Sequence, residues 1–336
     1  MDPFIPVPPE HYGGIERVIY DIANQYVEMG HQVTIVAGPN SKSPGRLITY
    51  SENGPLSAEF NLKIFLEVFW ILRKEIRSHD VIHNFGRLLF ILPFLKRKTK
   101  KVQTFMRYVN RNNIIKFDKV HPRNLTYTAV SDAIKETGNT PNSHWETVYN
   151  CAPIEQFDFQ ANTSPDSYLV FLGRIERCKG LHQAIKVARL LQRELIIAGN
   201  LSELPEEITY YEKEIKPLID GRLIKYIGVV NNQQKNTLLG NASALLTPVE
   251  WFEPFPIIIP EAYACGTPVL GFKNGGVPEG IEHGVTGFIS ETAEEMAAQV
   301  KLLHTIDRRN CRLAAENKYS DAVIANNYLA IYKNKQ

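Results

Sequence analysis

The feature that most constrains the fold is an alternation of short β-forming runs with amphipathic segments along the whole chain. Runs rich in β-branched and aromatic residues predict strands over residues 32–37, 80–83, 101–105, 125–130, 168–172, 194–198, 223–227, 244–247 and 268–271. Apolar residues at helical spacing predict helices between them, among others over 15–29, 62–77 and 181–191. Strands that alternate with helices indicate an α/β fold with doubly wound, parallel sheets.

The length of 336 residues favours two domains over one. A polar, proline-containing stretch at 160–167 separates two sets of strands, so we predict one domain over 1–160 and a second over 161–310. The last segment, 311–336, contains a helical pattern, and we expect it to pack back toward the first domain. A strand should precede the first helix, but only the proline-rich segment 2–7 is available, so that strand is either rudimentary or missing from the chain.

Composition and charge narrow the class of protein. Apolar residues make up 44% of the chain and charged residues 22%, as in a folded, soluble protein. The net charge of +2 argues against a nucleic-acid partner. Because residues 1–150 carry +5 and residues 151–336 carry −3, a peripheral membrane contact would involve the first domain. The four cysteines are far apart, and neither a leader nor a run of about 20 apolar residues occurs, so we expect a cytoplasmic protein.

The strongest chemical pattern lies between residues 250 and 289, where Glu253 and Glu261 stand eight positions apart. We predict a helix over 257–264 that ends at Gly266, with Glu253 in the loop before it. Unpaired backbone N–H groups at such a helix start suit a diphosphate, and the two carboxylates can reach sugar hydroxyls on either side of it. Taken alone, the pattern is explained better by one solvated glutamate and one glutamate placed by the helix dipole.

A second pattern follows the strand predicted at 168–172. Arg174 and Lys179 lie in the turn from this strand to a helix, flanked by Gly173 and Gly180. Open α/β sheets bind their ligands at this end of a strand, and a guanidinium together with an ammonium suits two phosphates. Two ordinary surface cations are the alternative, which the glycines at the turn weaken.

Other candidates are less specific. The pair Gly13-Gly14 at a helix start would let a phosphate or sugar approach the backbone, although a plain turn explains it nearly as well. His83 stands at the end of one predicted strand and Arg107 follows the next, and a lone histidine at a strand end is more often structural than catalytic. The basic run 96–101 indicates a solvated corner or, as the sharper alternative, a site for a lipid head group or an acidic glycan.

Several catalytic motifs are absent from the sequence. There is no Asp-x-Asp pair for a divalent metal, no His-Glu-x-x-His, no Gly-x-Ser-x-Gly and no phosphate loop of the nucleotide hydrolases. No Gly-x-Gly-x-x-Gly follows a strand, which argues against a dinucleotide enzyme. The turn at Gly275-Gly276 is tight, but the sequence does not show whether it faces a ligand. We therefore predict neither a metal site nor a cofactor.

Residues 168–289 closely resemble the family 4 glycosyltransferases, which are retaining enzymes of the GT-B fold. The resemblance rests on five segments in order: FLGRIERCKG, IIAGN, YIGVV, EPFPIIIPEAYACGTPV and GGVPEGIEHGVTGFI. The first half matches more loosely, through YGGIERV, VIHN, AVS and VYN. The resemblance implies two Rossmann-like domains whose parallel sheets face each other across a cleft, the first binding the acceptor and the second the nucleotide sugar.

The resemblance also implies roles for individual residues. Arg174 and Lys179 would hold the donor diphosphate and stabilise the charge of the leaving group, a task that a metal performs in other transferases. Glu253 would contact the donor sugar and Glu261 the ribose. The remaining assignments are a phosphate cradle at Phe255, Pro256, Ile257 and Ile258, closure by Gly14 from the first domain, the base near Val229, and His83 in the catalytic set.

The chain departs from the family pattern in four places. Pro256 replaces a common glycine and removes one N–H donor from the cradle. The family's Thr-x-His segment is Thr-Phe-Met-Arg here, so His83 or Arg107 would take the place of its histidine. Asn-Cys replaces Asn-Gly at 150–151, and the first strand is rudimentary or missing.

The function that these observations favour is retaining transfer of a hexose from a nucleoside diphosphate sugar. UDP is the commonest donor nucleotide in the family, and the acceptor would be a glycan, a glycolipid or a small hydroxyl compound, as in polysaccharide biosynthesis. Acceptor contacts would come from the first domain, near residues 107–113. Two alternatives stay open: a relative that binds a nucleotide sugar without transfer, and a nucleotide-sugar epimerase or another GT-B activity.

Overall fold

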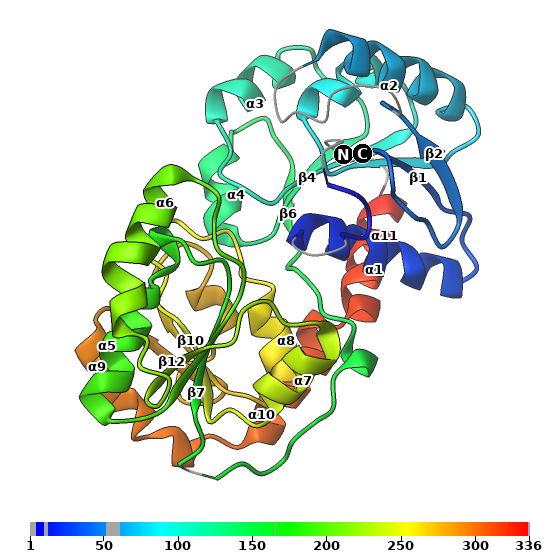
Figure 1. Ribbon diagram of the computed structural model, residues 1–336. Coiled ribbons are helices and arrows are strands. Elements are labelled where there is room, and N and C mark those ends of the chain that lie inside the picture. The colour runs from blue at the N-terminus through cyan, green and yellow to red at the C-terminus, as the bar shows by residue number, and fades with distance from the viewer. Residues whose placement is uncertain (1–4, 10–12, 52–60, 165, 335–336) are drawn as a thin grey trace. The chain divides into compact units, whose positions relative to one another are not determined.

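The computed structural model describes residues 5–9, 13–51, 61–164 and 166–334. The chain divides into two compact units, one formed by Met1–Cys151 with Asp321–Gln336 and the other by Ala152–Ser320. Both units are α/β, and their strands pair in parallel (Figure 1). None of the helices in these ranges combines the length and the apolar character that a membrane crossing needs.

The second unit is built on one six-stranded sheet in the order β12-β11-β10-β7-β8-β9. Its strands are β7 (Leu169–Leu172), β8 (Leu195–Ala198), β9 (Ile224–Tyr226), β10 (Ala244–Thr247), β11 (Val269–Phe272) and β12 (Gly287–Ser290). From β7 the chain moves outward to β9, returns to β10 on the other side of β7, and moves outward again to β12. This is the strand order of the dinucleotide-binding Rossmann fold, and the order reverses between β7 and β10.

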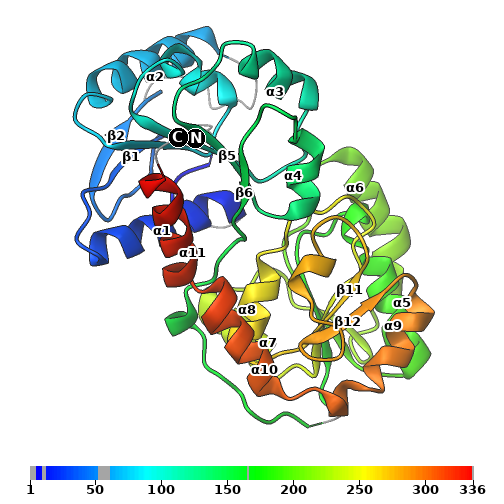
Figure 2. The ribbon, with the colours of Figure 1, turned by 180° about the vertical axis from the view of Figure 1, so that it is seen from behind.

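Helices cover both faces of this sheet. α5 packs against α9 on one face, while α8 contacts α7 and α10 on the other, as Figure 1 and the reverse view in Figure 2 show. All residues of β7, β10 and β11 are buried, so these strands are nearly continuous apolar runs, as parallel sheets require. The helices are α5 (Leu181–Leu191), α6 (Pro205–Tyr210), α7 (Asn232–Gly240), α8 (Ile258–Ala264), α9 (Ala293–Val300) and α10 (Arg308–Ala314).

In its described residues, the first unit contains a four-stranded sheet, β3-β4-β5-β6, and a separate pair, β1-β2. The strands are β1 (Thr34–Ala37), β2 (Arg46–Thr49), β3 (Val81–Asn84), β4 (Lys100–Phe105), β5 (Leu125–Ala129) and β6 (Trp145–Thr147). The helices are α1 (Gly14–Glu28), α2 (Leu62–Glu75), the 3-10 segment η1 (Leu88–Phe94), α3 (Arg111–Asp118), α4 (Asp132–Gly138) and α11 (Asp321–Lys333).

All nine strands that the sequence predicts are present in the structure, within a few residues of their expected bounds. The pattern does not predict β2, β6 and β12. Each of these is three or four residues long, and a charged residue or a glycine interrupts its β-forming character: Arg46 in β2, Glu146 in β6 and Gly287 in β12. Their pairing comes from neighbouring strands rather than from local preference.

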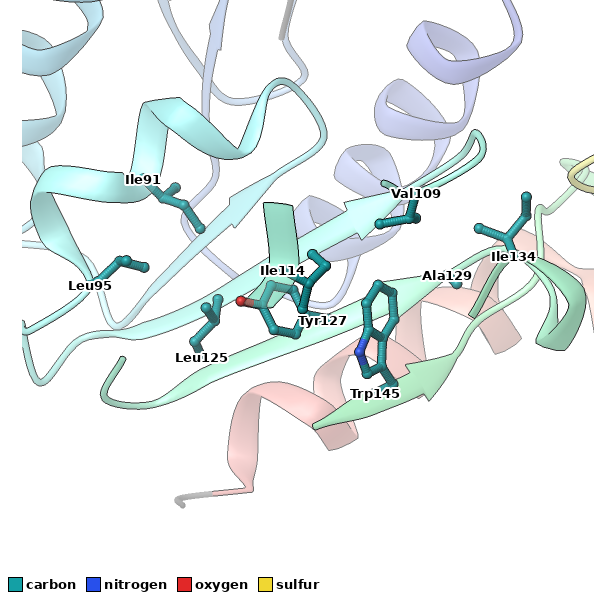
Figure 3. Close-up of a cluster of buried hydrophobic side chains, with 9 residues drawn as sticks. All are labelled: Ile91, Leu95, Val109, Ile114, Leu125, Tyr127, Ala129, Ile134 and Trp145. Atoms are coloured by element: carbon teal, nitrogen blue, oxygen red, sulfur yellow. The ribbon is translucent and has the colours of Figure 1, made fainter. Parts of the chain in front are cut away.

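The core of the first unit lies on one face of its larger sheet. Trp145 of β6 stacks on Tyr127 of β5 with ring centroids 5.0 Å apart, and a Cβ built on Gly138 would crowd the Trp145 ring. Tyr127 also donates a hydrogen bond of 3.1 Å to Asp118 at the end of α3. Figure 3 shows the nine buried residues of this cluster: Ile91, Leu95, Val109, Ile114, Leu125, Tyr127, Ala129, Ile134 and Trp145.

The last helix, α11, completes the first unit although it lies far away in the sequence. It packs against α1 and β4. Lys100 Nζ donates to the carbonyl of Asn334 at 2.9 Å, and the hydroxyls of Tyr26 and Tyr332 are 3.1 Å apart. The predicted segment 311–336 is therefore divided between the two units. Its residues up to Ser320, which include the end of α10, belong to the second unit.

The boundary between the units precedes the expected position at residue 160. The first unit ends at Cys151, and the segment that follows is bonded to the second unit. The N–H of Gln160 donates to the carbonyl of Cys265 at 3.0 Å, and the N–H of Asp158 donates to Asn236 Oδ1 at 3.0 Å. The polar composition at 160–167 therefore reflects a connecting segment of the second unit and does not mark the end of the first unit.

The first half of the expected first strand, residues 2–4 of 2–7, lies outside the described residues. Of its described part, Val7 is fully buried and packs beside Ile35 and Ala37 of β1. Among the described residues, no strand pairs with both β1 and β3, which belong to separate sheets. Both strands line a mainly apolar cavity of about 200 Å³ in the first unit.

Arg308 of α10 joins several loops of the second unit. Its side chain is buried, with 8% of the residue exposed. The guanidinium donates to the carbonyls of Gln160 (2.7 Å), Ala242 (2.9 Å) and Gly240 (2.8 Å) and to the hydroxyl of Thr267 (2.9 Å). A single side chain thus satisfies buried acceptors that have no regular secondary structure to pair with.

We predict that Arg308→Met lowers the free energy of unfolding by about 3–5 kcal/mol, because the carbonyls around the guanidinium would stay buried without donors. Arg309→Met is the matched control, since Arg309 is exposed, and it should change stability by about 0.5 kcal/mol or less. Urea unfolding followed by circular dichroism at one pH measures both. Equal stability of the two variants would contradict this role.

Candidate active site

The candidate site is built where the strand order of the second unit reverses, at the carboxyl ends of β7 and β10. After β7 the chain passes through Arg174 to a 3-10 turn, η3 (Arg177–Lys179), and enters α5. Gly180 has φ +74°, and a Cβ there would overlap the carbonyl oxygen of Pro248 in the loop after β10. The N–H of Glu250 donates to the carbonyl of Cys178 at 2.8 Å. Backbone contact therefore locks the two loops together.

This contact brings two of the predicted site residues into an ion pair. Lys179 Nζ lies 2.7 Å from Glu253 Oε2, and the side chains are 18% and 9% exposed. The indole of Trp251 donates to the same carboxylate oxygen, and Lys179 Nζ lies 4.9 Å above the Trp251 ring. Both donors reach Oε2, so within the described part of the chain Oε1 keeps its capacity to accept a further hydrogen bond. A partly exposed ammonium beside an oriented carboxylate can bind an anion and a hydroxyl together.

The turn at Gly275-Gly276 packs directly on the backbone of Glu253. The N–H of Gly276 donates to the Glu253 carbonyl at 2.7 Å. Gly275 has φ +56°, and a Cβ on it would overlap the backbone of Glu253. Asn274 Nδ2 donates to the carbonyl of Val249 at 2.7 Å, which ties the same two loops together a second time. The turn after β11 thus fixes the position of the Glu253 backbone.

Arg174 lies at the same sheet edge, two residues after β7. Its Nη1 is 2.9 Å from Oε1 of the buried Glu176, and about a third of its side chain, 34%, is exposed. Burial raises the pKa of the nearby Cys178 thiol, which therefore stays protonated and is a poor nucleophile. The site accordingly offers two cations and a carboxylate rather than a reactive thiol.

Glu261 occupies a different environment from Glu253. The predicted helix is confirmed as α8, with Ile257 at its N-cap and Gly266 beyond its end at φ +82°. Glu261 forms a buried ion pair with Lys235 of α7, whose Nζ also lies 5.4 Å above the ring of Phe157. The Glu261 carboxylate is thus held in place from α7.

The backbone groups expected to cradle phosphate surround the start of α8. Phe255 is buried, with its ring 5.7 Å from that of Tyr319. Pro256 has no N–H, and its carbonyl accepts from Ile259 at 3.1 Å. The N–H groups of Ile257 and Ile258 stand at the first turn, where a helix has no acceptors of its own.

Loops after β7, β8 and β9 are bonded to one another along the same edge. The N–H of Gly173 donates to the carbonyl of Ala198 at 3.0 Å, and that of Gly199 donates to the carbonyl of Gly228 at 2.8 Å. Val229, where the base is expected, follows Gly228 and is 61% exposed. The structure therefore places Val229 in a loop that is linked to the loop of Arg174.

His83 and Gly14 lie in the first unit. The ring nitrogens of His83 are hydrogen-bonded to the hydroxyls of Tyr332 and Thr104, at 2.6 Å each. Burial lowers the pKa of His83 to about 3, so the imidazole is neutral. Gly14 is the first residue of α1. Catalytic work by His83 and closure on the donor by Gly14 stay predictions.

Three contributions to the site were not expected from the sequence: the indole of Trp251, the ammonium of Lys235, and the support that Gly275 gives to Glu253. Trp251 stands inside the strongest pattern, two positions before Glu253, so the sequence already pointed to the segment that contains it. Lys235 lies in a helix with no motif and meets Glu261 only through the packing of α7 on α8.

Comparison with known proteins places the chain in a family. Residues 154–319 match the profile of the glycosyl transferases group 1, and residues 12–155 match that of glycosyltransferase family 4. Together the two profiles account for the sequence from 12 to 319. The chain belongs to glycosyltransferase family 4.

Curated relatives of this glycosyltransferase differ in the reactions that their names give. A phosphatidylinositol N-acetylglucosaminyltransferase subunit of Schizosaccharomyces pombe is 23% identical in an alignment of 330 positions that covers 88% of this chain and 70% of the relative. N-acetyl-alpha-D-glucosaminyl L-malate synthase of Bacillus anthracis is 25% identical over 66% of this chain and 62% of the relative. An uncharacterized 41.2 kDa protein in the cps region of Klebsiella pneumoniae is 30% identical over 49% of this chain and 46% of the relative. The chain thus spans less than two thirds of two of these three proteins.

Solved structures resemble the glycosyltransferase over almost its whole length. AviGT4, involved in avilamycin A biosynthesis, has a TM-score of 0.70 at 22% identity, covering 99% of this chain and 93% of its own. A glycosyltransferase from Rickettsia africae has a TM-score of 0.77 at 19% identity over 96% and 94%. Anabaena HepE in complex with UDP-glucose has a TM-score of 0.73 at 18% identity over 95% of each chain. These likenesses show the GT-B fold.

We predict that Gly275→Ala lowers the transfer activity of this glycosyltransferase about tenfold or more, because a methyl group would push the Glu253 backbone out of place. Gly284→Ala is the matched control: Gly284 has a similar φ, +79°, but open space around its Cβ position. The control should lose only about 1 kcal/mol of stability and keep its activity. Steady-state rates at matched folded fractions decide between local displacement and general backbone strain.

Proposed function

We propose that this glycosyltransferase transfers a hexose from a UDP-sugar to a hydroxyl acceptor with retention of the anomeric configuration. The observation that carries the proposal is the Lys179–Glu253 pair at the point where the strand order reverses, directly ahead of α8. Ligands of open α/β sheets bind at this point. The choice of uridine as the donor base is supported by Anabaena HepE, a protein of the same fold that was solved with UDP-glucose.

Lys179 and Arg174 are the proposed binding groups for the donor diphosphate. An ammonium and a guanidinium together match its negative charge, and both side chains remain partly exposed. When the bond to the sugar breaks, negative charge grows on the leaving diphosphate, and fixed cations stabilise it most at that stage. The N–H groups of Ile257 and Ile258 add backbone donors to the same anion.

Glu253 and Glu261 are the proposed contacts to the two sugars of the donor. Oε2 of Glu253 is held by Lys179 and Trp251, which leaves Oε1 to accept from a hydroxyl of the transferred hexose. Glu261, oriented by Lys235, accepts from the ribose hydroxyls. The base is then proposed to lie along the loop of Val229.

A catalytic role for His83 carries an additional requirement. Both of its ring nitrogens are engaged by hydroxyl groups, and its imidazole is neutral. A catalytic contact with the transferred sugar would require His83 to exchange the hydroxyl of Tyr332 or of Thr104 for a substrate hydroxyl. Retention itself needs no protein nucleophile here if the donor phosphate takes the proton of the acceptor on the same face of the sugar.

The acceptor is the least specified part of the reaction. The names of two relatives give acceptors as different as phosphatidylinositol and L-malate. A glycan, a glycolipid and a small hydroxyl compound therefore all fall within the proposal. Two alternatives have distinct signatures, since a pure binding protein would hold the donor without releasing UDP, and an epimerase would convert the donor sugar without any acceptor.

The proposal is tested by incubating the protein with UDP-glucose, UDP-galactose or UDP-N-acetylglucosamine, in EDTA or in magnesium, and measuring the UDP released. We expect slow release from one donor in EDTA as well as in magnesium, since Arg174 and Lys179 supply the positive charge. Early proton NMR spectra should show the released sugar with the α configuration of the donor.

Three outcomes would contradict the proposal. Release that requires magnesium would remove the two cations from their proposed role. A β-configured product would exclude retention. Conversion of the donor sugar without UDP release would indicate an epimerase, and donor binding without any turnover in the presence of acceptor mixtures would indicate a binding protein.

A further inference from the structure

Helix α2 of the first unit has two apolar faces, and the described residues of the chain cover one of them. Ile64 and Val68 are buried, and they pack with Tyr50 and Phe90 in one cluster. On the opposite side, Leu62, Leu66 and Trp70 are 60%, 47% and 56% exposed. They stand four positions apart and therefore form one stripe along the helix. Three large apolar side chains in such a row indicate a surface that contacts something other than water.

Cations share this side of the helix with the apolar stripe. Lys63, Arg73, Lys74 and Arg77 are all exposed. At 3.6 residues per turn Lys63, Arg73 and Lys74 fall, together with the three apolar residues, within about one third of the helix circumference, and Arg77 follows in the turn after the helix. The guanidinium of Arg73 lies 5.7 Å from the centroid of the Trp70 ring, so charge and apolar surface are in direct contact.

The segment η1 runs alongside α2 and extends the same surface. The rings of Phe65 and Phe90 stack at 6.5 Å and those of Phe69 and Phe94 at 5.6 Å. The hydroxyl of Thr99 donates to the carbonyl of Ile76 at 3.3 Å, which holds the chain after η1 beside the end of α2. We call the combined surface the α2 face; it comprises Leu62, Lys63, Leu66, Trp70, Arg73, Lys74, Arg77, Leu92, Lys96, Arg97 and Lys98.

The basic run after η1 is only partly a surface feature. Lys101 donates from Nζ to the carbonyls of Arg97 and Thr99, at 2.7 Å each, and is fully buried. Lys100 is also buried and donates to Thr126 at 2.9 Å. The two lysines thus serve the fold, while the three cations before them, at 96–98, stay exposed.

The acidic residues of α2 do not neutralise this surface. Glu75 forms a two-pronged pair with Arg46, at 2.9 and 3.1 Å, away from the stripe. Glu67 accepts from the N–H of Ser51 at 3.1 Å. Seven exposed cations of the α2 face therefore act with the same sign.

We propose that the first unit binds to an anionic lipid bilayer through the α2 face. Cations at the level of lipid phosphates and apolar side chains reaching just below them are what an interfacial amphipathic helix requires, and a tryptophan is well suited to that depth. The charge is complementary to acidic lipid head groups, and the four exposed apolar residues distinguish the surface from one that only binds polyanions. This inference does not depend on the proposed transfer reaction.

The test uses sedimentation with vesicles of phosphatidylcholine, with or without phosphatidylglycerol. We expect the protein to sediment with the anionic vesicles and to dissociate from them as the salt concentration is raised. It should not sediment with the neutral vesicles. The variant Lys63→Gln/Arg73→Gln/Lys74→Gln should partition about a hundredfold less, at about fivefold per charge. The control Lys213→Gln/Lys301→Gln/Arg309→Gln removes the same net charge from exposed positions of the second unit and should change partitioning little.

Tryptophan fluorescence reports the apolar part of the contact independently. Anionic vesicles should shift the emission of the protein to the blue, because Trp70 moves out of water. Trp70→Phe should abolish this shift, whereas Trp251→Phe should keep it. Trp251 is exposed to a similar extent, 41% against 56%, but lies in the second unit.

Specific results would overturn the proposal. They are the absence of sedimentation with anionic vesicles, equal loss of binding in the α2-face variant and the second-unit control, and a blue shift that survives Trp70→Phe. Retention on an acidic polysaccharide column without vesicle binding would also overturn it, since an acidic glycan would then be the occupant.

Discussion

The close approach of two backbone loops, after β7 and after β10, is the constraint on which the candidate site depends. It requires a residue without a side chain at Gly180, in a left-handed conformation, because the carbonyl of Pro248 occupies the space of a Cβ. The contact carries Lys179 to within 2.7 Å of Glu253, although the two are distant in sequence. Gly275 then supports Glu253 from the next strand. The loops after three neighbouring strands, β7, β10 and β11, thus meet at Glu253. Close backbone contacts at Gly180 and Gly275 hold these loops together.

Charge follows from this geometry. The second unit, residues 152–320, carries 17 Lys/Arg against 21 Asp/Glu and so has a net charge of −4, yet its sheet edge holds Lys179 and Arg174 beside mostly buried carboxylates. Ion pairs with Glu253 and Glu176 hold these two cations in place, which is what the proposed binding of a diphosphate needs. Lys235 and Glu261 form a second, more deeply buried pair behind α8. The first unit carries exposed positive charge of its own at the α2 face.

The sequence predicted the fold well, because nine of the strands are apolar enough to be recognised alone and the helix over 181–191 coincides with α5. It also located the ends of β7 and β10, where charged residues follow apolar runs and, after β7, glycines flank them. Short strands such as β6 were beyond it, since Trp145 and its neighbours pair only in the context of β5. The partner of Glu261 was equally hidden, because Lys235 approaches it through helix packing. The first compact unit ends at Cys151, ahead of the predicted boundary at residue 160, because Gln160 is bonded to Cys265 and Arg308 of the second unit and composition does not reveal such bonds.

Calorimetric titration with UDP and with uridine tests the central claim most directly, namely that Lys179 binds the donor diphosphate. The wild-type protein should bind UDP much more tightly than uridine. Lys179→Met should weaken UDP binding about 10- to 100-fold, as expected for loss of a charged hydrogen bond, and should leave uridine binding unchanged. Lys186→Met, which removes an exposed lysine paired with Glu294 on the same helix α5, should bind UDP like the wild type. Equal affinity of the wild type and Lys179→Met for UDP would contradict the claim.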